Sequence, residues 1–293
     1  MIMLAKKISD RGLLKLLKKS ENISHSGELL YVNDSKVFFG DDGAEVVNQF
    51  DKWMASSRHE KRWIGISGSW RYINQAVVND TALIVRSLIK RGVGIITGGA
   101  LGVDFIATEI MLKESDPAEN LRIVLPINKD AYMQRYTDVY MQQYTDAGLQ
   151  TNVTRTQADA LTSQIFYMAT HFPKIIFDKT PFNEIEFIAL QNDHYRKLAY
   201  NFRNGLVGYG CEGLVALCVN DSSGVQDTVR KLEKMKKPHS LVQYQIATNS
   251  SDIITDYSNL QINGLIKEYP LKRLEDSTSE KISLIQQPST SLH

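Results

Sequence analysis

The sequence predicts an α/β protein whose main domain is a three-layer sandwich, with a mostly parallel sheet between two layers of helices. Short apolar segments at residues 64–67, 93–97 and 122–126 have the composition of buried parallel strands. Segments with helical periodicity separate them, and strands that alternate with helices form parallel sheets with right-handed crossovers. Glycine-rich loops follow two of these strands, and a serine-rich loop follows a later one. In this architecture such loops gather at the carboxyl edge of the sheet, where ligands bind.

Length and composition agree with a globular chain that buries a core. Of the 293 residues, 23% are charged and 43% are hydrophobic, and the net charge is +1. A charge this small gives no long-range attraction to nucleic acid or membranes, so an anion site must be a local patch. No apolar segment reaches the ~20 residues of a membrane-spanning helix, and the N-terminus lacks the pattern of a signal peptide. We therefore expect a cytoplasmic protein without a membrane partner.

Neither the cysteines nor the histidines indicate a metal site. Cys211 and Cys218 lack the spacing of metal ligands, and the six histidines show no mutual ligand spacing. Cys211 also has no nearby histidine that would make it a nucleophile, so a buried thiol is the simpler interpretation. We predict no metal ion and no cofactor.

The chain begins with a basic segment in which Leu13, Leu16 and Leu17 share one face of a short helix. This helix either docks its leucines on the protein, with its lysines in solvent, or forms a basic arm that contacts nucleic acid.

Residues 1–58 as a whole are predicted to form a small α+β preface. After the basic helix we expect strands at 28–31 and 36–39, a turn at 40–43 and a helix at 46–54. The preface is a candidate surface for a homodimer or another protein partner.

The main domain is predicted to span residues 59–246, with a polar and flexible tail at 247–293 whose last part, 275–293, is disordered. Its first helix stops at Gly92, after Lys90 and Arg91 in the last turn. The expected strands are, in order, 64–67, 93–97, 122–126, 213–220 and 240–244. Two further helices are expected at residues 103–113 and from the serine-rich loop to residue 236.

Residues 131–202 are predicted to be mostly helical and are rich in tyrosine. Tyr132, Tyr136, Tyr140 and Tyr144 follow one another at intervals of four residues. Such a stripe is either an aromatic surface on which bases stack, or a helix face that packs its rings while the hydroxyl groups reach water.

The three loops after the strands share a design that suits phosphate. Glycine lets an anion approach the backbone amides, a serine hydroxyl adds a donor, and arginine binds phosphate through two hydrogen bonds. A helix that starts directly after the loop adds free N–H groups. The candidate phosphate ligands are Gly68, Ser69 and Arg71 in the first loop, Gly98, Gly99, Gly102 and Asp104 in the second, and Ser222, Ser223 and Gly224 in the third.

Two common nucleotide motifs are missing from these loops. The segment from Gly65 to Gly68 departs from the Gly-x-Gly-x-x-Gly fingerprint, and no acidic residue ends the second strand to hold a ribose. There is also no Walker lysine, so ATP hydrolysis is not expected. The loops therefore predict binding of phosphate or a nucleotide without naming a dinucleotide or ATP.

The motifs GISGSWR, ITGGALGVDFIA, FRN and SSG, in this order, resemble the Rossmann-like superfamily that contains DNA-processing protein A (Smf) and the lonely-guy proteins. The resemblance covers residues 62–244. It implies a Rossmann-like fold and, for the DNA-processing branch, binding of single-stranded DNA. It also adds Arg203 and Asn204, from the FRN motif, to the candidate site.

The chain departs from both branches of this superfamily. Trp70 is inserted between Ser69 and Arg71, and Thr108 stands where the DNA-processing pattern has histidine. The lonely-guy enzymes cleave the N-glycosidic bond of nucleoside monophosphates with a glutamate in the last loop. That loop has no glutamate here, and Asp227 is a shorter carboxylate at another offset. Glu184 and Glu186 either replace the catalytic glutamate or, as the simpler interpretation, are acidic residues on a helix surface.

These observations favour a protein that binds a nucleotide or single-stranded nucleic acid without catalysis. Two alternatives stay open: an N-glycosidic hydrolase of nucleotides, and a sensor domain that binds a nucleotide signal and acts on a partner through the preface.

Overall fold

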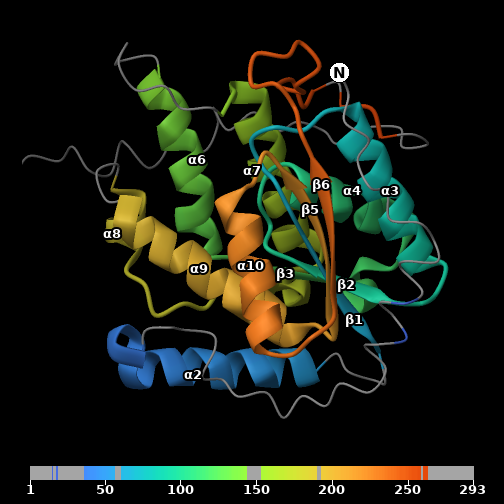
Figure 1. Ribbon diagram of the computed structural model, residues 1–293. Coiled ribbons are helices and arrows are strands. Elements are labelled where there is room, and N and C mark those ends of the chain that lie inside the picture. The colour runs from blue at the N-terminus through green and yellow to red at the C-terminus, as the bar shows by residue number, and fades with distance from the viewer. Residues whose placement is uncertain are drawn as a thin grey trace, which may run out of the picture.

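The computed structural model describes residues 15, 18, 36–56, 61–143, 153–189, 193–258 and 260–262. Figure 1 shows one sheet with helices on both sides, which confirms the α/β prediction. Helices α3 and α4 pack on one face of the sheet and helices α9 and α10 on the other. Among the described residues, no helix is long and apolar enough to cross a membrane.

The sheet has six strands in the order β4-β3-β2-β1-β5-β6, and every neighbouring pair is parallel. The prediction of a mostly parallel sheet is thus confirmed, and β4 was not expected within the helical middle. The strands are β1 (Trp63–Gly68), β2 (Gly94–Thr97), β3 (Leu121–Val124), β4 (Ile176–Phe177), β5 (Gly213–Val219) and β6 (His239–Tyr244).

The helices alternate with the strands as predicted. They are α3 (Gln75–Ile89), α4 (Val103–Glu114), α5 (Pro117–Asn120), α6 (Lys129–Gln143), α7 (Arg155–His171), the short η2 (Pro173–Ile175), α8 (Glu184–Ile188), α9 (Asp193–Gly210) and α10 (Ser223–Lys234). The last helix ends two residues earlier than expected, at Lys234.

The predicted strand at 36–39 and turn at 40–43 are wrong. Both segments belong to one helix, α2 (Lys36–Ala55). A short apolar run does not distinguish a strand from a helix. A helix already stabilised by the burial of Phe50 and Met54 extends at little cost, because adding a residue to an existing helix is easier than starting one. The other predicted strand, at 28–31, lies outside the described residues, as do Leu13, Leu16 and Leu17.

Helix α2 covers the amino edge of the sheet, at the bottom of Figure 1. The Phe50 ring packs edge-on against Phe177, 5.1 Å between centroids, and tilted against Tyr209 at 6.2 Å. Trp53 donates a hydrogen bond to the Lys174 carbonyl and lies beside the Arg122 guanidinium. The described part of the preface therefore docks at the edge opposite the predicted ligand loops.

The segment after β6 returns across the domain. Ile254 N–H donates to the Ile73 carbonyl at 2.8 Å, and Tyr257, Leu260 and Ile262 are buried. This polar stretch, which we assigned to the tail, thus packs on the domain as far as residue 262. The part predicted to be disordered, 275–293, lies outside the described residues.

Candidate functional site

The first and third loops meet at the carboxyl edge of the sheet. β1 and β5 are parallel neighbours, with Gly68 opposite Leu217, and Ser69 N–H donates to the Leu217 carbonyl at 3.0 Å. The strand order reverses between β1 and β5, and sheets of this type bind ligands at that switch point. Gly68 ends β1, and Gly99 and Ser223 lie in the segments that follow β2 and β5, so the three residues share the carboxyl edge as predicted.

Ser69 fastens the first loop to the end of β5. Its hydroxyl accepts a hydrogen bond from Val219 N–H at 2.8 Å and donates to the Val219 carbonyl at 3.3 Å. The side chain is buried and already bonded, so its hydroxyl positions the loop. Arg71, two residues further, is exposed and lies 4.6 Å from the Trp70 ring centroid. Arg71 is therefore the group of this loop that reaches solvent.

The second loop wraps around a carboxylate of the chain itself. Asp104 accepts a hydrogen bond from Gly98 N–H at 3.0 Å. It also accepts backbone hydrogen bonds from Ala100 and Gly68. Burial raises the pKa of Asp104 to about 6, and the Arg203 guanidinium and the three amides oppose this rise. Asp104 thus fills the position that an anionic ligand would take among these amides.

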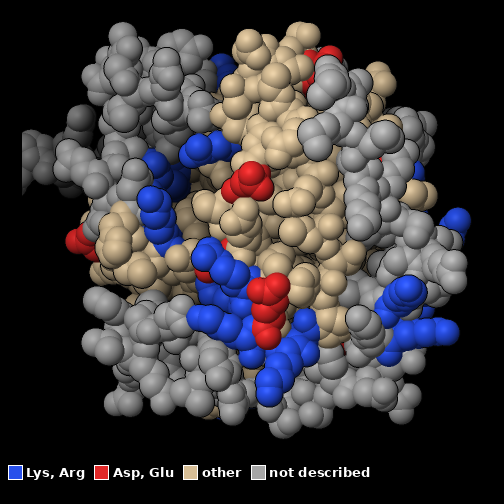
Figure 2. All heavy atoms as spheres, in the orientation of Figure 1, with Lys and Arg blue, Asp and Glu red and all other residues tan. Residues whose placement is uncertain are grey.

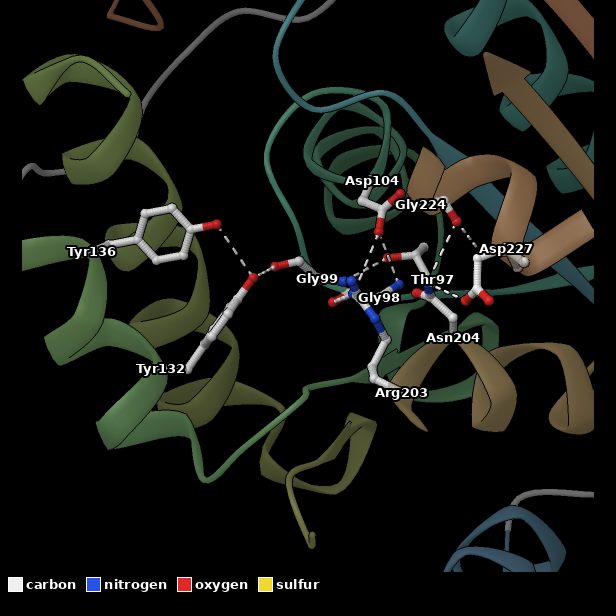
Figure 3. A network of polar contacts seen from close by, with 11 residues as sticks. Thr97, Gly98, Gly99, Asp104, Tyr132, Tyr136, Arg203, Asn204, Gly224 and Asp227 are labelled. Carbon is white, nitrogen blue, oxygen red and sulfur yellow. Dashed lines mark hydrogen bonds and ion pairs between the residues drawn. The ribbon is translucent and has the colours of Figure 1, made fainter. Parts of the chain in front are cut away.

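Arg203 reaches the same loop from α9, as Figure 3 shows. Its Nη1 donates to the Gly98 carbonyl and lies 3.9 Å from Asp104 Oδ2. A Cβ atom on residue 98 would come within 1.7 Å of Nη1, so only glycine leaves room for this guanidinium. The side chain is buried, and among the described residues its Nε has no hydrogen-bond partner.

Two tyrosines complete the second loop. The Tyr257 hydroxyl accepts a hydrogen bond from Gly102 N–H at 3.0 Å, and the Tyr132 hydroxyl donates to the Gly99 carbonyl at 3.2 Å. Gly102 has a φ of 73°, and a Cβ atom there would lie 2.2 Å from the Ser69 carbonyl oxygen. The N-terminus of α4 is therefore closed by the chain's own groups.

The third loop is open. Ser222 is the N-cap of α10 but makes no side-chain capping bond, and Ser223 and Gly224 are exposed. A Cβ atom on Gly224 would meet nothing within 4 Å. Asn204 donates to the Gly224 carbonyl at 3.4 Å and to Asp227 Oδ2 at 3.2 Å, which ties α9 to this loop. The first amides of α10 therefore face open space.

The structure divides the predicted site residues into two groups. Those at the surface of the edge are Arg71, Asn204, Ser222, Ser223 and Gly224, and those within the second loop or fixing the first are Gly68, Ser69, Gly98, Gly99, Gly102, Asp104 and Arg203. Sequence reasoning missed Tyr257, because nothing in its polar surroundings indicates a buried contact. The spacing of Tyr132 and Tyr136 did indicate an aromatic cluster.

The acidic and cysteine candidates form neither a metal-ligand cluster nor an activated nucleophile in the described part of the chain. Among the described residues, no three His, Cys, Asp or Glu side chains gather as metal ligands. Glu184 and Glu186 are exposed on α8, and Asp227 forms an ion pair with Lys231. Burial raises the pKa of the Cys211 thiol to about 11, which suits an unreactive thiol.

Comparison with known proteins gives structural similarity at low sequence identity. No protein-family model matches the chain, and no curated protein matches it. DNA processing protein A from Helicobacter pylori, described for its single-stranded DNA binding mode, is 17% identical with a TM-score of 0.39, over 71% of this chain and 73% of that one. DNA processing protein A from Streptococcus pneumoniae is 13% identical with a TM-score of 0.32, over 80% and 95%. The chain is similar in structure to DNA processing protein A over most of its length.

Proposed function

We propose that this protein binds, without cleaving it, a nucleotide or the phosphate backbone of a single-stranded nucleic acid at the carboxyl edge of its sheet. The observation that carries the proposal is the open N-terminus of α10 at the switch point, next to the loop that bears Arg71. The free amides and the helix dipole at such an end attract negative charge.

The contrast with α4 supports this choice of place. The amides around the start of α4 already bond to Asp104 and Tyr257. At the start of α10, Ser222 leaves the first amides uncapped, and the exposed Gly224 lets an anion approach the backbone. A phosphate bound there would neighbour Arg71, because the Ser69 hydroxyl holds the first loop against the end of β5.

We propose a binding role and not hydrolysis because Asp227, the carboxylate in the first turns of α10, is engaged. Asp227 accepts from Asn204 and pairs with Lys231. A general base or a stabiliser of a leaving base needs a carboxylate that faces the ligand. Binding in the cytoplasm, with the preface as the surface for a protein partner, completes the proposal.

The test places a charge at the open helix end. Ser223→Asp puts a carboxylate where the phosphate would bind, and an acid in the first turn of a helix does not destabilise it. We expect titration calorimetry to show at least about tenfold weaker binding of AMP or of single-stranded DNA, the ligand described for the Helicobacter pylori protein.

Ser223→Asn is the matched control, because asparagine has nearly the same size as aspartate but carries no charge. It should bind within about twofold of the parent. If Ser223→Asp binds like the parent, the phosphate does not lie at α10 and the proposal fails.

A further inference from the structure

A cluster of tyrosines lies beside the second loop, between α6 and α9. Tyr132 and Tyr136 come from α6 and Tyr200 from α9. The Tyr132 ring lies 5.3 Å from Tyr136 and 6.5 Å from Tyr200, measured between centroids. Figure 3 shows the Tyr132 and Tyr136 hydroxyls pointing from α6 toward the loop at Gly98 and Gly99. The cluster therefore borders the same edge of the sheet as the proposed phosphate site.

The two tyrosines of α6 differ in what they do for the fold. Tyr132 is fully buried and its hydroxyl holds the Gly99 carbonyl. Tyr136 is half-buried, and its hydroxyl lies 3.4 Å from that of Tyr132. The Tyr132 hydroxyl thus holds the loop, whereas Tyr136 packs against the core and stays partly exposed.

The surroundings of this cluster are basic. Arg203 lies 5.6 Å from the Tyr200 ring centroid, and the positive charges of Arg203, Arg135 and Arg196 all act on the Tyr200 hydroxyl. Figure 2 shows a hollow on this face between α6 and α10, with Lys and Arg side chains beside it. Aromatic rings and guanidinium planes are the groups on which proteins stack unpaired bases.

We infer that the hollow between α6 and α10 holds an unpaired nucleobase against Tyr136, while the phosphate attached to the same nucleotide lies at the N-terminus of α10. This inference rests on the proposed function and adds the part of the ligand that the phosphate site leaves unspecified. The base belongs either to a free nucleotide or to a single strand. Bases stacked inside a duplex would not reach the ring.

The experiment compares ligands that have a base with ligands that lack it. The probes are AMP against ribose 5-phosphate, and a thymidine oligonucleotide against an abasic strand of the same length. The variants of the full chain are Tyr136→Ala, Tyr136→Leu and Tyr136→Phe. Leucine fills space without an aromatic face, and phenylalanine keeps the ring without the hydroxyl. Tyr167→Ala is the control, because Tyr167 is a half-buried tyrosine of α7 that packs on His171.

We expect Tyr136→Ala and Tyr136→Leu to weaken binding of the base-bearing probes by about fivefold or more, and to leave the base-free probes unchanged. Tyr136→Phe and Tyr167→Ala should bind all four like the parent. An effect confined to AMP identifies a free nucleotide as the ligand, and one confined to the oligonucleotide identifies a strand.

Two results would overturn the inference while leaving the phosphate site intact. One is unchanged binding of the base-bearing probes by Tyr136→Leu. The other is an equal loss for base-bearing and base-free probes, since the ring would then act through the fold or the phosphate. If the parent binds none of the four probes, the proposed function fails together with this inference.

Discussion

Asp104 accepts backbone hydrogen bonds from the second loop and lies 3.9 Å from the Arg203 guanidinium, with both side chains almost fully buried. Glycine at residue 98 leaves free the space that the guanidinium occupies, since a Cβ atom there would come within 1.7 Å of Nη1. At the scale of single residues, these contacts explain why the second loop, which the sequence predicts to bind phosphate, has no amides left for a ligand at Asp104. The amides of this loop and Arg203 of α9 surround the carboxylate of Asp104.

The pKa of Asp104 gives a prediction whose sign is fixed by linkage. Burial raises this pKa from the ordinary 3.8 to about 6, so between these values the folded chain holds a proton that the unfolded chain has lost. The stability that Asp104 contributes is complete below about pH 4 and is lost as the pH rises through 6. The total change is roughly 3 kcal/mol.

Asp104→Asn removes this titration. The free energy of unfolding of the parent, relative to the variant, should therefore be larger near pH 4 than near pH 7.5, as measured by urea denaturation. The opposite sign would show that Arg203 and the three amides outweigh burial and lower the pKa of Asp104.

A second residue-scale prediction concerns catalysis. The carboxylate of Asp227 is bonded to Asn204 and paired with Lys231, so we expect no release of free base from nucleoside monophosphates above background. Chromatography of the incubation mixture measures it. Base release that disappears on changing Arg203 or Glu186 to alanine would instead establish the hydrolase.

At the scale of elements, the segment after β6 holds the start of α4. Thr154 and Thr156, around the start of α7, donate to the Thr255 carbonyl, and the Tyr257 ring packs 5.2 Å from Phe105. The hydroxyl of Tyr257 then meets Gly102 N–H. A segment without regular structure thus joins α7, α4 and the second loop.

Tyr257→Phe tests this contact. It keeps the ring but leaves the buried Gly102 amide without its acceptor, which costs roughly 1–3 kcal/mol. Chemical denaturation should show this loss, and Tyr167→Phe, at a half-buried tyrosine on α7, should stay within about 0.5 kcal/mol of the parent. Equal stability of Tyr257→Phe and the parent would show that water replaces the hydroxyl.

The strands and helices also show which parts of the fold the sequence predicts. The parallel strands and their glycine loops follow from local apolar runs and turn residues, so β1, β2, β3 and β5 were predictable. The segment 36–39 was not, because a short apolar run fits a strand or a helix equally well. Closure of the second loop depends on Asp104 meeting Arg203, 99 positions apart in the sequence (203 − 104), and on Tyr257, which no local pattern reveals.

At the scale of the whole molecule, α9 joins the two edges of the sheet. Arg203, near the middle of the helix, contacts the second loop at the carboxyl edge, and a Cβ atom on Gly210, at its C-terminal end, would come within 2.8 Å of the Phe50 ring of α2. The carboxyl edge and the described part of the preface therefore contact the same helix about two turns apart. Because the net charge is only +1, an anionic ligand is attracted by local charged groups and not by the charge of the whole molecule.

Salt dependence measures how many such groups contact phosphate. The logarithm of the affinity for a single strand falls with the logarithm of salt by about 0.7 per phosphate neutralised. Arg71 is exposed at the edge, whereas Arg203 is buried beside Asp104. We therefore expect a shallow slope, between about −0.7 and −1.4, and Arg71→Ala should flatten it by about 0.7.

Two comparisons decide whether Arg71 or the basic arm carries this slope. Lys90→Ala removes an exposed positive charge just after α3, at the amino edge, and should leave the slope unchanged. Deleting residues 1–20 removes the arm, including the exposed Lys15 and Lys18. If the deletion leaves binding intact while Arg71→Ala flattens the slope, the sheet edge is the binding site. If the deletion flattens the slope and Arg71→Ala does not, the arm contacts the phosphates. Should both variants bind DNA like the parent, the loops serve another ligand, and the sensor hypothesis replaces nucleic-acid binding.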